Sequence, residues 1–170
     1  LHVLLGDVRT QAQLTAGTLR PRIELCRLDG LVDSAVDAAR PLLDRKGLRL
    51  VRDAAAAPIE IATDCELVHQ IVLNLVANAV KFTDRGEVVV QVAADELWVR
   101  VEVRDTGRGI APEHLARIFE PYWQVARGYR RGADGLGIGL SVARELARLL
   151  GGDVRVRSRP EIGSAFELWL

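Results

Sequence analysis

The stretch NLVANAVKFT, residues 74–83, has the pattern of a buried helix interrupted by polar residues. Four polar side chains fall within about 80° of one another on a helix that turns about 100° per residue: Gln70, Asn74, Asn78 and Lys81. Apolar residues fill most of the remaining circumference. The stretch therefore predicts a buried helix over 65–82 with a wide apolar arc and one narrow polar stripe, which must face either water or a ligand.

Length and composition favour a globular protein of one domain, with or without a short appendage. The chain has 170 residues, of which 49% are hydrophobic and 5% aromatic, and its formal net charge is 0. Bulk electrostatics therefore predict no nucleic-acid or membrane partner. No run approaches the roughly 18 apolar residues of a membrane helix, and no signal-peptide pattern is present. We expect a cytoplasmic protein.

Three residue types carry further expectations. Cys26 and Cys65 lie in apolar surroundings without metal-like spacing, which predicts two reduced, mostly buried thiols. The chain contains no methionine and begins at Leu1, so we expect a piece of a longer protein. All but two of the 23 basic residues are arginine. One of the two lysines, Lys81, lies on the polar stripe, where a compact ammonium group differs in use from a guanidinium.

The pattern of apolar residues, caps and turns predicts alternating helices and strands. Helices are expected over 1–16, 30–46, 65–82, from Pro112 to about 119, and 138–150. Strands are expected near 22–26, 47–52, 58–62, 88–94, 97–103, 153–158 and 164–170. The order is that of a two-layer α/β sandwich. The stretch 120–137 has no periodicity, which predicts a long, mobile and functional loop.

Four short stretches recur in a recognisable order: NLVANAVKFT, DTGRGI (105–110), IFEPYWQ (118–124) and GLGIGL (135–140). Each alone has a plain structural explanation, such as a tight turn, a solvated hairpin end or a core plug. Together they resemble the N, G1, F and G2 boxes of the ATP-binding catalytic domain of bacterial sensor histidine kinases. That superfamily also contains DNA gyrase, heat-shock chaperone ATPases and mismatch-repair ATPases.

The resemblance runs from about residue 28 to the end and includes GSAF (163–166). It implies the Bergerat ATP-binding fold, in which a mixed sheet packs on about three helices. It also implies that residues 1–20 are the end of a dimerisation helix with its linker, and that residues 21–170 form the ATP-binding domain.

The resemblance further implies ATP and Mg²⁺ as cofactors and gives roles to the polar stripe. Asn78 would supply a neutral amide oxygen to the metal, a hard ligand suited to Mg²⁺. Lys81 would place a point charge near the phosphates, and Asn74 would add a second amide to the metal or its waters. Asp105 would accept the exocyclic amine of adenine.

Glycines complete the implied site. Gly107 and Gly109 would let the backbone approach the base. The G2 glycines precede the helix 138–150, whose free N–H groups and positive end would meet the triphosphate. The implied nucleotide-binding set therefore also contains Ile110, Gly135, Leu136, Gly137, Gly139, Leu140 and Ser164.

The loop 120–137 corresponds to the family's nucleotide lid and carries three arginines, Arg127, Arg130 and Arg131. We expect at least one to meet the γ-phosphate, with solvated lid charges as the alternative for each. Asp134 stands before the G2 glycines, where the family often has glycine or a small hydroxyl residue. An acid there could weaken nucleotide binding or could cap the following turn.

Position 74 separates kinases from hydrolases within the superfamily. The hydrolysing ATPases carry a glutamate there as general base for water, whereas Asn74 cannot accept a proton at neutral pH. The phosphoacceptor histidine is expected outside this chain, because His2 lacks the right context and His69 and His114 fall inside the catalytic domain. His69 is expected to be a core or edge residue.

These features predict a histidine protein kinase domain that transfers the γ-phosphoryl group of Mg-ATP to a histidine outside this chain, for relay to an aspartate. The implied partners are its own dimerisation domain, in a homodimer, and a response-regulator receiver domain. No nucleic acid or membrane contact is expected for this chain, although its parent could be membrane-anchored. Two alternatives remain open: a degenerate nucleotide-binding or protein-interaction module, which Asp134 favours, and a protein-serine kinase of the anti-sigma type.

Overall fold

The computed structural model describes residues 2–53, 58–124 and 136–170, with side chains from Gly6 onward. Its helices are α1 (His2–Thr15), α2 (Leu28–Lys46), α3 (Cys65–Phe82), α4 (Pro112–Leu115) and α5 (Gly139–Leu149). Its strands are β1 (Glu24–Arg27), β2 (Arg49–Asp53), β3 (Glu60–Thr63), β4 (Glu87–Ala94), β5 (Val99–Asp105), β6 (Asp153–Arg159) and β7 (Gly163–Trp169).

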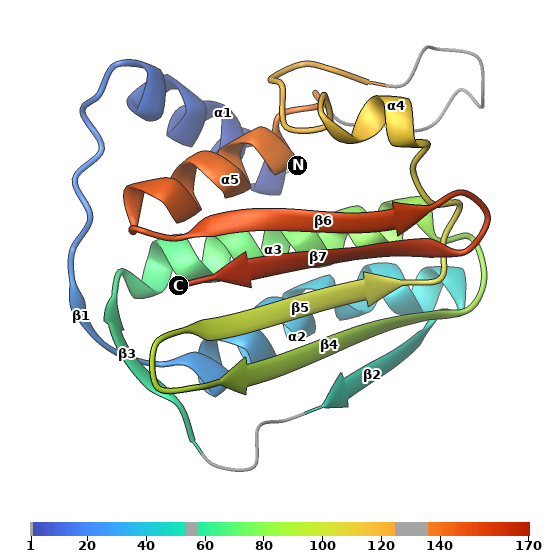
Figure 1. Cartoon of the computed structure of the whole chain (residues 1–170), viewed down its shortest axis with the longest axis horizontal. Coiled ribbons are helices and arrows are strands. Elements are labelled where there is room, and N and C mark those ends of the chain that lie inside the picture. The colour runs from blue at the N-terminus through green and yellow to red at the C-terminus, as the bar shows by residue number, and fades with distance from the viewer. Residues whose placement is uncertain (1, 54–57, 125–135) are drawn as a thin grey trace.

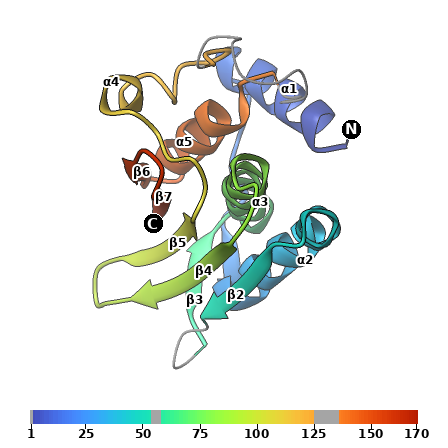
Figure 2. The same cartoon turned by 90° about the vertical axis from the view of Figure 1, so that its right-hand side faces the viewer.

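The main sheet has five strands in the order β2-β4-β5-β7-β6. Strand β2 runs parallel to β4, and the other neighbours pair antiparallel. Helices α2, α3 and α5 cover one face of this sheet, and α1 lies beside α5 (Figures 1 and 2). The predicted two-layer α/β sandwich with a mixed sheet on about three helices is confirmed.

Helix α3 lies at the centre of the helical layer, between α2 and α5 (Figure 2). Its apolar arc is fully buried at Ile71, Val72, Leu75 and Val76. This arc meets inward-facing valines of the sheet, such as Val103. The wide apolar arc that the sequence predicts is therefore the centre of the core.

The opposite face of the sheet carries a polar ladder, as is common where an antiparallel sheet faces water. Glu102 on β5 lies directly opposite Glu167 on β7. The Arg157 guanidinium lies 3.0 Å from the Glu102 carboxylate and 2.6 Å from that of Glu167. The arginine therefore offsets the repulsion between two carboxylates that face one another across the strands.

Four strands begin two residues later than predicted: β1, β2, β3 and β5. Two helix boundaries are also wrong. Helix α2 begins at Leu28 and not at residue 30, so Asp29 lies in its first turn; the Asp29 carboxylate accepts a hydrogen bond from the Ile59 amide at 3.3 Å. Helix α4 ends at Leu115 and not near 119, because the chain turns there to bury Ile118. The predicted loop 120–137 is described only at its two ends.

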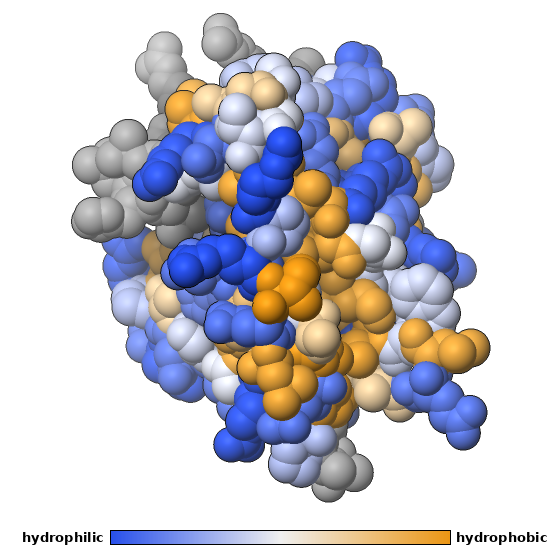
Figure 3. Space-filling model, turned by 90° about the vertical axis from the view of Figure 1, so that its left-hand side faces the viewer, coloured by the Kyte–Doolittle hydropathy of each residue, from blue (hydrophilic) through white to orange (hydrophobic). Residues whose placement is uncertain are grey.

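The two cysteines form a disulfide, so the prediction of reduced thiols is wrong. Strand β1 pairs antiparallel with β3 in a separate two-stranded sheet, which brings Cys26 beside Cys65, the first residue of α3. The bond joins residues 39 positions apart. Apolar side chains gather on this side of the molecule (Figure 3), and β1 and its approach contribute the exposed Ile23 and Leu25.

Within the residues described, no helix has the length and apolar character needed to cross a membrane.

Candidate functional site

The C-terminal half of α3 presents Asn78 and Lys81, both half-buried. The Lys81 ammonium nitrogen lies 5.0 Å from the centre of the Phe82 ring, and the Arg108 guanidinium lies 4.5 Å from the same centre. The Phe82 carbonyl also accepts a hydrogen bond from the Arg108 amide at 3.3 Å. These contacts join the end of α3 to the loop after β5. This loop carries the DTGRGI motif, which begins at Asp105, the last residue of β5.

Lys46 holds the same end of α3 from the other side, a role that sequence reasoning missed. Its ammonium group donates to the carbonyl oxygens of Val80 at 2.7 Å, Lys81 at 2.9 Å and Thr83 at 2.9 Å. Three donors on one compact cation match three carbonyls at a helix C-terminus, where positive charge is favourable. This geometry accounts for the second lysine in a chain otherwise rich in arginine.

Asp105 is the buried carboxylate at the end of β5, with 5% of its surface exposed. It accepts a hydrogen bond from the Gly107 amide at 2.8 Å. Burial raises the pKa of the Asp105 carboxyl above its ordinary value, while the backbone N–H groups of Gly107 and Ser164 oppose that rise. Among the described residues, no arginine or lysine forms an ion pair with Asp105. The carboxylate is thus held by neutral donors and keeps acceptor capacity for a ligand.

The glycines of the DTGRGI loop are required by close contacts with neighbouring backbone atoms of the protein. A Cβ atom on Gly107 would lie 2.4 Å from the Phe82 carbonyl oxygen. Gly109 has φ +66°, and a Cβ atom there would lie 1.9 Å from the Arg159 carbonyl oxygen. Both glycines are therefore required by the close packing of this loop on α3 and on the end of β6, which is a different reason from the predicted approach to a base.

The hydroxyl groups of Ser158 and Ser164 form a small cluster that contacts the DTGRGI loop. Ser164 pairs with Asp105 across β5 and β7, and its hydroxyl lies 3.0 Å from that of Ser158. The Ser158 hydroxyl accepts a hydrogen bond from the Ile110 amide at 2.8 Å. Ile110 and Ser164 are therefore brought to the same place as Asp105.

The IFEPYWQ and GLGIGL motifs meet at a backbone hydrogen bond. The Tyr122 amide donates to the Gly137 carbonyl at 3.0 Å, and Gly137 has φ +71°. Helix α5 begins at Gly139, after the apolar residue Ile138, which provides no side-chain cap. The N-cap residue of α5 therefore leaves the first N–H groups without a side-chain acceptor of its own, and their contact with a triphosphate stays a prediction. Leu136 is exposed, and Leu140 is half-buried in the first turn of α5.

Helix α1 covers the other half of the polar stripe. Asn74 is only 5% exposed, and its amide donates to the Asp7 carboxylate at 3.0 Å and to the Gly139 carbonyl at 3.3 Å. The Gln70 amide donates to the same Asp7 oxygen at 3.1 Å. Gln70 and Asn74 thus contact the polar face of α1, a protein partner that the sequence did not predict for the stripe.

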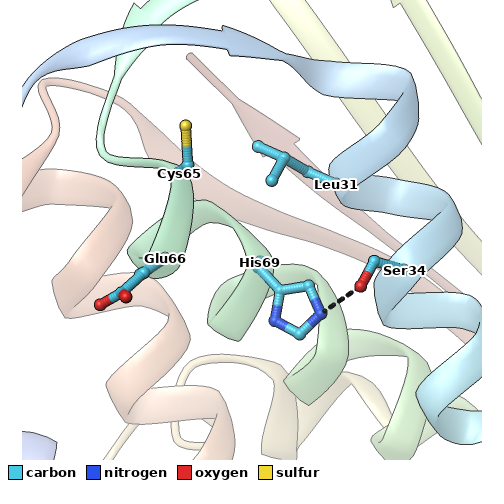
Figure 4. A pocket seen from close by; sticks show the side chains of 5 residues that line it. All are labelled: Leu31, Ser34, Cys65, Glu66 and His69. Carbon is cyan, nitrogen blue, oxygen red and sulfur yellow. Dashed lines mark hydrogen bonds between the residues drawn. The ribbon is translucent and has the colours of Figure 1, made fainter.

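A separate pocket lies near the N-terminal end of α3 (Figure 4). It has a volume of about 340 Å³ and is lined by Leu31, Ser34, Cys65, Glu66 and His69. The His69 Nε2 atom and the Ser34 hydroxyl lie 3.3 Å apart. His69 is therefore an edge residue, as predicted, and none of the predicted site residues lines this pocket.

Several predicted residues lie outside the described part of the chain: Arg127, Arg130, Arg131, Asp134 and Gly135. The side chain of His2 also lies outside it, and His114 packs on the Trp123 ring at 5.3 Å between centroids.

Residues 63–170 match the family of histidine kinase-, DNA gyrase B- and HSP90-like ATPases. This match covers more than half of the chain and contains α3, Asp105 and α5. The chain therefore belongs to that family.

Several of the similar proteins are named as sensor histidine kinases. The chain is 39% identical over 127 residues to the sensor histidine kinase RcsC of Escherichia coli, covering 74% of this chain and 13% of RcsC. It is 34% identical over its whole length to the non-motile and phage-resistance protein of Caulobacter vibrioides, 21% of which is covered. Full-length ShkA in complex with AMPPNP superposes with a TM-score of 0.86 at 32% identity, over 98% of this chain and 34% of ShkA. The chain thus spans about a fifth or less of the length of these two curated relatives.

Proposed function

We propose that this chain is the ATP-binding catalytic domain of a sensor histidine kinase, with residues 1–20 as the end of its dimerisation helix and linker. The domain would transfer the γ-phosphoryl group of Mg-ATP to a histidine outside this chain, for relay to an aspartate of a response-regulator receiver domain. The observation that carries the proposal is Asp105, a buried carboxylate between the end of α3 and the start of β7, to which the described residues offer neutral donors and no ion pair.

The nucleotide would be bound by two kinds of group. Asp105 would accept the exocyclic amine of adenine, and the apolar side chains of Ile110, Leu136 and Leu140 would border the base. Gly135, Gly137 and Gly139 would lead the phosphates to the uncapped start of α5. The AMPPNP bound to full-length ShkA, a structure of high similarity, supports this assignment.

The end of α3 would hold the metal side of the nucleotide. Asn78 offers a neutral amide oxygen, which suits Mg²⁺ because that ion uses few protein ligands beside phosphates and waters. Lys81 would neutralise phosphate charge. Asn74 would help to position the metal or its waters and would not act as a base. These residues act through orientation and charge, which is how phosphoryl transfer is catalysed with little covalent work by the protein.

The partners in the proposal are the chain's own dimerisation domain, in a homodimer, and a receiver domain. A cytoplasmic location follows from the need for ATP and a receiver domain. The Cys26–Cys65 disulfide would then have to persist in a compartment where thiols are normally reduced. The redox state of the two cysteines in the cell should therefore be measured directly.

Calorimetric titration of the whole chain with AMPPNP and Mg²⁺ tests the proposal. We expect micromolar binding that weakens about 100-fold in Asp105→Asn, because the neutral amide has one acceptor oxygen in place of two and lacks the charge that strengthens the hydrogen bond from the adenine amine. Asp37→Asn, an exposed acid on α2, is the matched control and should bind as the unaltered chain does.

Two results would redirect the proposal. Absence of binding by the unaltered chain would favour the degenerate module. Binding without acid-labile phosphohistidine, once the upstream helices are supplied, would exclude the histidine kinase and favour another acceptor.

A further inference from the structure

Asn74 is held in one orientation by two acceptors from different elements. The Asp7 carboxylate from α1 and the Gly139 carbonyl at the start of α5 lie 3.0 Å and 3.3 Å from its amide nitrogen. Because both neighbours can only accept, the NH₂ group must face them and the amide oxygen must point away. Asn74 is thereby left with its oxygen as the atom it can offer to a ligand.

Asp7 is itself fixed in place. It is 4% exposed, and its Oδ1 atom accepts from Gln70 Nε2 at 3.1 Å as well as from Asn74. Gln70 also donates to the Thr10 hydroxyl at 3.2 Å, one turn further along α1. Two turns of α1 are thus joined to two turns of α3 by buried polar contacts. A buried carboxylate that accepts from two amides costs stability if either partner is removed.

We propose that Asp7 is a positioning residue for the nucleotide site, which sets the amide of Asn74 so that its oxygen serves the metal side. This inference rests on the proposed function. Asp7 lies outside residues 63–170, the part that matches the family, so a helix that precedes the matching part would complete the site. The placement of α1 then decides whether Asn74 is oriented for Mg-ATP, since Gly139 alone can accept only one of the two amide hydrogens.

The experiment measures the gain in AMPPNP affinity that Mg²⁺ provides, as the ratio of Kd in EDTA to Kd in Mg²⁺, on the whole chain. We expect Asp7→Ala to lower this gain about tenfold, the usual effect of removing a group that orients a metal-site residue. The Kd in EDTA should stay unchanged within about twofold, because adenine and phosphate contacts remain. Asp7→Asn keeps an acceptor oxygen and should retain most of the gain, and Asp37→Ala should retain all of it.

A purely structural role would change the melting temperature and leave the Mg²⁺-dependent gain intact, and that result would overturn the proposal. If the unaltered chain does not bind AMPPNP at all, the proposed function fails, and the role of Asp7 fails with it.

A second measurement needs no variant and covers the case in which Asp7→Ala does not fold. By NMR, the two side-chain amide hydrogens of Asn74 should exchange with water much more slowly in the unaltered chain than those of a free asparagine. Exchange as fast as that of a free asparagine amide would show that the Asp7 and Gly139 contacts do not hold, and would overturn the proposal.

Discussion

The two ends of α3 are held by different chemistry. At its N-terminal end, the Asp64 carboxylate caps the helix by accepting from the Leu67 amide at 3.0 Å and also accepts from the Arg22 amide at 2.7 Å. The Cys26–Cys65 disulfide joins the first residue of the helix to β1. At its C-terminal end, Lys46 and a buried Thr83 satisfy the last carbonyls through hydrogen bonds alone.

Because the two ends are held differently, changes at each end should affect folding stability and nucleotide binding differently. The N-terminal end is fastened covalently at Cys65, nine or more residues along α3 from Asn74, Asn78 and Lys81. The C-terminal end carries Asn78 and Lys81 and is held by contacts that can be made and broken individually. Changes at the N-terminal end should therefore reduce the free energy of unfolding alone, and changes at the C-terminal end should also reduce nucleotide affinity.

Removing the disulfide should give the largest effect on stability. In the chain-entropy account, a bond that closes a loop of 39 residues contributes about 4 kcal/mol to the free energy of unfolding. We expect a loss of that order in Cys26→Ser/Cys65→Ser, measured by urea unfolding, with AMPPNP affinity unchanged. The same loss should appear when the unaltered chain is reduced. Two titratable thiols in the chain purified without reductant would contradict the bond.

Removing the Lys46 hydrogen bonds at the C-terminal end of α3 should lower the free energy of unfolding less than removing the disulfide does, and should lower the nucleotide affinity more. Lys46→Ala leaves three carbonyls without their donor, and we expect a loss of about 2 kcal/mol in the free energy of unfolding. Because Asn78 and Lys81 lie in or beside the loosened turn, AMPPNP affinity should fall several-fold. The neighbouring, exposed Arg45→Ala is the matched control. Unchanged affinity in Lys46→Ala would mean that this end of α3 keeps its geometry without the cap.

The N-terminal cap offers a smaller test of the same contrast. Asp64→Ala removes the acceptor for two backbone N–H groups, which should lower the free energy of unfolding by about 1–2 kcal/mol. Nucleotide affinity should not change. The comparison with Asp44→Ala, an exposed acid on α2, isolates the cap. A loss of affinity in Asp64→Ala would show that the two ends are not independent.

The smallest expected effect is a pH dependence next to the C-terminal end. Burial raises the pKa of Asp105, so its ionised form costs folding stability at neutral pH, and that cost disappears as pH falls through the raised pKa. Asp105→Asn should therefore unfold no more easily than the unaltered chain at pH 7. Any advantage of the variant should shrink towards acidic pH, as thermal melts from pH 7 to pH 3 would show. An advantage that grew in acid would mean that Asp105 is stabilised by its charge.

Local signals in the sequence predicted most of the fold. The wide apolar arc of α3 follows from side-chain periodicity, and the structure keeps it as buried core. Strands β4 and β5 form where the sequence predicts them, although each buries three consecutive residues, 88–90 and 101–103, where strict alternation would bury every second one. The short α4 is different. Its pattern extends to Phe119, yet tertiary packing of Ile118 ends the helix at Leu115.

The parts of the site that could not be predicted depend on contacts between distant residues. The positions of Asp105, Ile110 and Ser164 follow from motifs, and the structure brings them together. Lys46 and Asp7 act on residues 34 or more positions away, so no spacing rule reveals them. The sequence offered two signals: an acid, Asp7, on the helix 1–16, and Gln70 one turn before Asn74. Both residues are equally typical of a solvent-exposed helix face.

The N-terminal segment contacts α3 through two different elements. Cys26 on β1 is bonded to Cys65, and Asp7 on α1 accepts hydrogen bonds from Gln70 and Asn74. Cys65 and Asn74 are nine residues apart, roughly 13.5 Å along the helix axis at about 1.5 Å per residue. Because Asn74 lies one turn before Asn78, the contact with α1 is the nearer of the two to the predicted metal ligand.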